Sequence, residues 1–265
     1  MDLFKDKFHS FCYIKVQINL TMNKFWVLLV VGSLPFTTFS QKKKSDTYTF
    51  QPISGIVIDG NLNEWNDQLI PIEDDAWSFG IGKEGDKLFV AVRVQDPVLR
   101  QEVIRNGIIV NLSYTDRKKD GAQLTYPFPD RERLRALSQN EDLDRSAFQQ
   151  ELLNSSRGYY VKGFSKVING LLSFENNYGV KAVVKLDSNE HFLYEAEIPL
   201  GLIEFEEEEI AVQIVVNNVF RQLQKAAKNR SGSSPYSMYG RMQVVESTRN
   251  PYKFETDVWV FGKVK

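Results

Sequence analysis

The sequence predicts an all-β protein, an antiparallel β-sandwich of jelly-roll-like build with a small helical insertion around residues 130–154. Two observations favour this fold class. Apolar and polar side chains alternate along several short segments, which is typical of antiparallel strands that have one face in water. Clusters of Gly, Asp, Asn and Ser separate these segments, as turns do in a sandwich of many short strands.

The mature protein is expected to lack residues 1–40. Met22-Asn23-Lys24 precedes an apolar run that ends near Val31, and small residues at 38 and 40 precede Gln41, as in a secretory signal peptide. The run is too short to span a bilayer comfortably. An N-terminal extension with an internal anchor is the alternative. The expected organisation is a mis-start at 1–21, a signal peptide at 22–40, a flexible leader at 41–49 and one sandwich domain at 50–265.

Export would place the mature chain in the periplasm, at the outer membrane or outside the cell, without a transmembrane span. It would also remove Cys12, the single cysteine, and with it any thiol chemistry. The remaining chain keeps 29 of the 33 Lys and Arg residues and 32 of the 34 Asp and Glu residues. A slightly acidic protein offers no electrostatic case for binding nucleic acid.

The strands are expected where apolar residues recur with a period of two. In the run 192–198, for example, Phe192 and Tyr194 face inward, and Glu195 and Glu197 face water. The other expected strands lie at 56–58, 78–81, 88–94, 180–186, 210–216 and 258–260.

Helices are expected only in the insertion. One helix covers 131–139 after Asp130, and a second covers 146–153 after Asp144, because an Asp before an apolar-periodic run is a good N-cap. The segment 225–237, rich in Lys, Ser and Gly, is expected to be a long loop.

The segment Ile56–Trp65 is expected to open the sandwich. Asp59-Gly60 predicts a tight turn, since Gly reaches positive φ and the Asp side chain bonds nearby backbone N–H groups. Trp65 then offers a large apolar surface, and we expect it to plug one end of the core.

This segment resembles the opening of the family-9 carbohydrate-binding-module-like domains of bacteria. The pattern is Ile-x-Ile-Asp-Gly-x-Leu-x-Glu-Trp over 56–65, and the run from Asp86 to Asp96 is similar to the family's second block. The resemblance implies a secreted β-sandwich that binds sugars between aromatic side chains and can hold structural calcium.

Sugar binding requires aromatic rings that stack on pyranose faces. Trp77 follows three acidic residues and precedes a strand, so we expect it at a rim, as the first stacking platform; a packing role is the alternative. Tyr236 and Tyr239, in the expected loop, are the second choice.

Calcium prefers oxygen ligands from loops. Asp59, Asn61 and Asn63 offer such oxygens on the opening turn, and the alternative is that they only bond the turn backbone.

Catalysis is poorly supported by the sequence. No Gly-x-Ser-x-Gly elbow is present. The mature chain would keep only His191 and no thiolate, which argues against zinc. A glycosidase would need two carboxyl groups facing each other across a cleft. The candidates for such a pair are Glu64, Asp67, Asp96, Glu195 and Glu197.

Three classes of function therefore remain. The first and expected one is a non-catalytic glycan-binding module, and the second is a sandwich that docks to a cell-envelope protein without binding sugar. The third is a carboxylate-based glycoside hydrolase.

Overall fold

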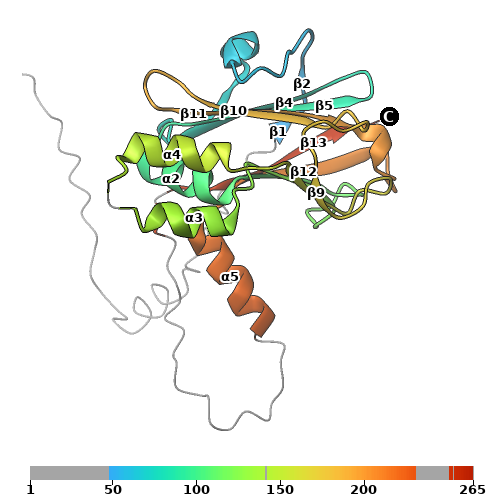
Figure 1. Ribbon diagram of the computed structural model, residues 1–265. Helices are drawn as coiled ribbons and strands as arrows, with labels where there is room; N and C mark the ends of the chain where they lie inside the picture. The colour runs from blue at the N-terminus through green and yellow to red at the C-terminus, as the bar shows by residue number, and fades with distance from the viewer. Residues whose placement is uncertain (1–47, 141, 231–250, 253, 265) are drawn as a thin grey trace, which may run out of the picture. The chain divides into compact units, whose positions relative to one another are not determined.

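The computed structural model describes residues 48–140, 142–230, 251–252 and 254–264 (Figure 1). The predicted mis-start, the signal peptide and most of the leader lie outside these residues. In the described part of the chain, no helix is both long and apolar enough to cross a membrane.

One sheet has seven strands in the described residues, in the order β1-β13-β12-β6-β7-β8-β9. Its neighbours pair antiparallel except for β1 and β13, which run parallel. The strands are β1 (Tyr48–Thr49), β6 (Ile108–Leu112), β7 (Ala122–Tyr126), β8 (Tyr159–Lys162), β9 (Gly170–Leu172), β12 (Glu209–Val216) and β13 (Asp257–Lys263).

The other sheet has six strands over the same described range, with the order β10-β11-β5-β4-β2 and with β3 paired to β4. The β2–β4 pair is parallel, so both sheets are mixed rather than purely antiparallel. The strands are β2 (Gln51–Pro52), β3 (Ile70–Ile72), β4 (Trp77–Glu84), β5 (Lys87–Val94), β10 (Lys181–Leu186) and β11 (Phe192–Pro199).

The two sheets contribute to one apolar core. Alternate residues of β5, such as Val90 and Val92, and of β12, such as Val212 and Ile214, are fully buried in it. The period-two pattern thus identified the inward rows of these strands correctly. Their burial removes apolar side chains from water, which is the main stabilising term of such a fold.

Four helices occur in the described residues, so the protein is mostly β rather than all-β. Helices α3 (Arg131–Ser138) and α4 (Arg145–Asn154) confirm the predicted insertion. The side chains of Asp130 and Asp144 accept hydrogen bonds from the first turns, as expected.

The other two helices were not predicted. Helix α2 (Pro97–Asn106) is capped by Asp96, whose carboxylate accepts from the amides of Val98 and Leu99. Asp followed by Pro is a helix-start pattern. Helix α5 (Val219–Arg230) continues to residue 230, so the prediction of a loop from residue 225 is wrong over its first six residues.

The opening segment packs on the six-stranded sheet, on the side away from the main core. Trp65 lies in the 3₁₀ helix η2 (Leu62–Gln68) and is fully buried against Phe89 and Ala91, in a cluster separate from the main core. Its ring lies over Gly80, where an added Cβ would come within 2.5 Å of the ring. Trp65 is buried as predicted, but it covers the outer face of this sheet instead of plugging one end of the core.

Candidate functional site

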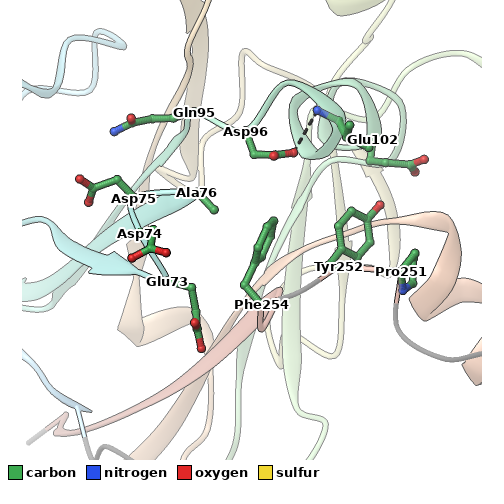
Figure 2. Close-up of a pocket in the computed structure, with 11 residues that line it drawn as sticks. Glu73, Asp74, Asp75, Ala76, Gln95, Asp96, Glu102, Pro251, Tyr252 and Phe254 are labelled. Carbon is green, nitrogen blue, oxygen red and sulfur yellow. Dashed lines mark hydrogen bonds between the residues drawn. The ribbon is translucent and has the colours of Figure 1, made fainter.

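A pocket of about 780 Å³ lies where three distant parts of the chain meet (Figure 2). The first part is the turn between β3 and β4, the second joins β5 to α2, and the third precedes β13. The residues that line the pocket are Glu73, Asp74, Asp75, Ala76, Gln95, Asp96, Val98, Glu102, Pro251, Tyr252 and Phe254.

The acidic turn holds three successive residues in the left-handed region, with φ of 41° at Glu73, 50° at Asp74 and 60° at Asp75. Such a conformation costs non-glycine residues roughly 1–2 kcal/mol each, least for Asp and Asn. The Ala76 carbonyl accepts from the amides of Gln95 and Asp96, both at 3.0 Å, which ties the turn to the end of β5. Strained backbone that is held in this way is typical of functional sites.

Two further carboxylates of the pocket are fixed by the chain. Asp96 caps helix α2 through its Oδ1, at 3.0 Å from the amide of Val98 and 2.7 Å from that of Leu99. The Oε2 of Glu102 accepts from the Asn106 side chain at 3.0 Å and from the amide of Val219 at 3.1 Å. Both groups therefore present their charge to the pocket from defined positions.

Tyr252 and Phe254 supply the aromatic part of the pocket. Their ring centroids are 5.8 Å apart, and the ring planes are tilted by 41°. Figure 2 shows both rings between the acidic turn on one side and Glu102 on the other. Burial, together with the charges of Glu102 and Asp96, raises the pKa of Tyr252 to about 12. The hydroxyl therefore stays protonated at neutral pH and can donate a hydrogen bond.

The chemistry of the pocket follows from this lining. Five carboxylic side chains and two aromatic rings line it, and no described lining residue is Lys or Arg. Carboxylates accept hydrogen bonds from hydroxyl or ammonium groups, and they repel anions. The volume lies in the range of small-molecule sites.

The predicted stacking platform, Trp77, is not in the pocket wall. Its side chain is fully buried in the main core, and its Nε1 donates to the Glu255 carbonyl at 2.8 Å. The prediction of a rim position is wrong. Trp77 is the first of the alternate β4 residues that pack into the main core, and Phe79 and Ile81 are the next two. Tyr236 and Tyr239 lie outside the described residues.

The three predicted calcium ligands follow one another on the opening turn. There the Oδ1 of Asp59 accepts from the amide of Asn61 at 2.7 Å, and the Oδ1 of Asn61 accepts from the amide of Asn63 at 3.2 Å. In these bonds the side chains accept from the backbone of the turn, which is the alternative to calcium binding that the sequence left open. Over the described ranges, no group of three or more His, Cys, Asp or Glu side chains is arranged to hold a metal ion.

The prediction that Glu195 and Glu197 face water is wrong. Glu195 is fully buried beneath the opening segment, where its Oε2 accepts from the amide of Gly60 at 2.7 Å and from that of Asp59 at 3.2 Å. Its Oε1 accepts from the Trp65 indole at 3.0 Å. Burial raises the pKa of Glu195, since the loss of hydration outweighs these donors.

Glu197, also buried, pairs with Lys87 at 2.7 Å and with Lys181 at 3.6 Å. The outer face of β11 is therefore covered near Glu195 and ion-paired at Glu197. Among the carboxyl groups predicted as candidates for a hydrolase pair, Glu195 and Glu197 are bonded to other groups of the protein. Asp96 lines the acidic pocket and caps helix α2.

Sequence reasoning missed Tyr252, Phe254 and Glu102 as site residues. The acidic triplet at 73–75 was a visible signal, since three adjacent carboxylates rarely serve packing. Nothing local in the sequence pointed from this triplet to residues some 180 positions away. Comparison of the chain with known protein families, with curated proteins and with solved structures finds no match.

Proposed function

We propose that this protein is an exported, non-catalytic carbohydrate-binding domain whose sugar site is the acidic pocket between the 73–76 turn, helix α2 and Tyr252. The observation that carries the proposal is the combination, in one pocket, of two aromatic rings with carboxylates at fixed positions. Protein sites for sugars need both an apolar plane and directed polar groups.

The binding mode follows from these groups. The C–H face of a pyranose ring would lie on Phe254 or Tyr252, and its hydroxyl groups would donate to the carboxylates of Asp74, Asp96 and Glu102. Neutral and amine-bearing saccharides fit this lining, whereas uronic acids and sulfated sugars would be repelled by its charge.

Further support comes from the fold and the N-terminus. Two mixed sheets that share one core are compatible with a jelly-roll-like β-sandwich. The pattern at 56–65 resembles that of the family-9 modules, and the signal-peptide pattern at 22–40 favours the periplasm, the outer membrane or the exterior as the site of action.

A second candidate function is docking to a cell-envelope protein without sugar binding. Exposed apolar side chains occur near the edge strand β9, and such groups are frequent at protein interfaces. They are Phe128, Ile168, Leu171, Phe174 and Tyr178.

Isothermal titration against neutral, amine-bearing and acidic saccharides, with and without calcium, tests the proposal. A solvent-accessible site with few stacking contacts should give dissociation constants in the micromolar to millimolar range, about −8 to −4 kcal/mol. Phe254→Leu keeps apolar volume but removes the flat ring, so it should abolish the heat of binding. Tyr178→Ala is the control, because this exposed tyrosine does not line the pocket.

Two results would count against the sugar site. One is the absence of binding across the whole panel by a folded wild-type chain, in which case the docking candidate takes its place. The other is saccharide binding that Phe254→Leu leaves unchanged.

A further inference from the structure

Another pocket, of about 420 Å³, lies among helices α2, α3 and α4. Helix α4 contacts both α2 and α3, and each of the three helices contributes side chains to the wall. Helix α2 provides Gln101, Ile104 and Arg105, and helix α4 provides Arg145 and Gln149. The lining of this three-helix pocket differs in charge from the lining of the acidic pocket, although α2 contributes to both.

The charged groups of this pocket are two arginines. The guanidinium of Arg105 lies 5.3 Å from the centre of the Phe148 ring, and that of Arg145 lies against the side-chain amide of Gln101. Neutral partners therefore orient both cations. Among the described residues, no Asp or Glu lines the pocket, so the positive charge is not neutralised within it.

A buried amide adds a donor without a partner. Gln149 is 4% exposed, and its Nε2 is shielded from solvent and makes no hydrogen bond. An unsatisfied buried donor costs roughly 1–3 kcal/mol. A ligand that displaces solvent here and accepts from this amide after a small rotation would recover that energy.

The rest of the wall combines four apolar side chains with the polar residues Ser138 and Asn140. Ile104 and Leu137 are buried, and Leu143 and Phe148 are partly buried against the core. An apolar wall beside two guanidinium groups suits a singly charged head group with an apolar body. Inorganic phosphate would satisfy the arginines but would leave the apolar wall uncovered.

We infer that the three-helix pocket binds a small organic carboxylate. Its carboxylate lies between Arg105 and Arg145 within reach of the Gln149 amide, and its apolar body lies on Ile104, Leu137 and Phe148. This site is independent of the proposed saccharide site.

The test is a titration of the full exported chain with benzoate and with octanoate, followed by ligand-observed NMR, with inorganic phosphate as the head-group-only probe. Wild type should bind the two carboxylates more tightly than phosphate. The double variant R105Q/R145Q should weaken carboxylate binding by about tenfold or more, equivalent to about 1.4 kcal/mol, because it removes both cations that pair with the carboxylate.

Two further variants separate binding from folding. Gln149→Leu removes the unpartnered donor, so it should weaken binding several-fold without lowering the melting temperature. Arg135→Gln is the matched control, since Arg135 is an exposed arginine of α3 outside the pocket wall. Phe254→Leu should leave carboxylate binding unchanged.

Failure of the folded wild-type chain to bind either carboxylate would overturn the inference. So would equal affinities for wild type and R105Q/R145Q, or tighter binding of phosphate than of both organic anions.

Discussion

Two regions of this protein use acidic side chains in different ways. At Glu195, three N–H groups of the opening segment fill the carboxylate oxygens, and the whole group is buried. In the acidic pocket, carboxylates line an open volume beside two aromatic rings. The first arrangement joins the opening segment to the six-stranded sheet, and the second places carboxylates around an open volume.

The difference lies in what satisfies each charge. A buried carboxylate needs donors of the protein in place of its lost water, and Asp59, Gly60 and Trp65 supply them to Glu195. They compensate the lost hydration only in part, because burial still raises the pKa of Glu195. The turn at 73–75 instead holds three carboxylic residues in left-handed backbone. We interpret this strain as the cost of presenting the charges to a ligand.

Removing the large aromatic groups should have the strongest effect on stability. Trp65→Ala should lower the free energy of unfolding by about 3–5 kcal/mol, and Trp77→Ala by a similar amount, because both rings are fully buried. Denaturant melts of both variants provide the measurement. A loss below about 1 kcal/mol at Trp77 would restore the rim position that the sequence predicted.

Glu195→Ala should cost about 2–4 kcal/mol, since it leaves the Trp65 indole and two backbone amides without their acceptor. Chemical denaturation measures this loss. The equivalent change in the pocket, Asp74→Ala, should change stability little. Equal losses at the two positions would remove the distinction between the two regions.

The pH dependence of the free energy of unfolding provides a further test of the buried carboxyl group of Glu195. Because burial raises the pKa of Glu195, the folded state binds its proton more tightly than the unfolded state does. The stabilisation from Glu195 is therefore complete below the ordinary Glu pKa and is lost as the pH rises through the raised value. Glu195→Gln cannot titrate, so the wild-type advantage over this variant should shrink as the pH rises above about 4. If the stability advantage of the wild type over Glu195→Gln grew with pH instead, the result would contradict a raised pKa of Glu195.

The smallest effect is expected in the strained turn. Asp74→Gly should raise the free energy of unfolding by roughly 0.5 kcal/mol, because Gly adopts positive φ without steric cost. The same change should weaken saccharide binding by removing a carboxylate. Thermal melts and titration calorimetry give the two readings, and a stability loss at this position would argue against strain.

The sequence predicted the inward rows of the strands and the two capped helices, because burial and capping leave local patterns. It could not predict that Glu195 is buried. Apolar and polar residues alternate along a strand in the same way whether its polar face is exposed to solvent or covered by another segment. The two mixed sheets depend on β1 and β2, which are only two residues long and too short to carry a pattern.

The acidic pocket was even less accessible to sequence reasoning. Its acidic turn was visible, but topology alone brings Tyr252 and Phe254 beside it. Trp77 was misplaced because an aromatic residue next to an acidic turn can face either side of the strand that follows.

The measurement that tests the saccharide site most directly is the rise in melting temperature caused by the best-binding saccharide of the panel. We predict that Asp74→Asn melts near the wild type and loses most of that rise. Glu195→Gln should melt at a lower temperature and keep the full rise. The opposite pattern, in which Asp74→Asn keeps the rise and Glu195→Gln loses it, would place the ligand at the opening segment and contradict the site proposed for the acidic pocket.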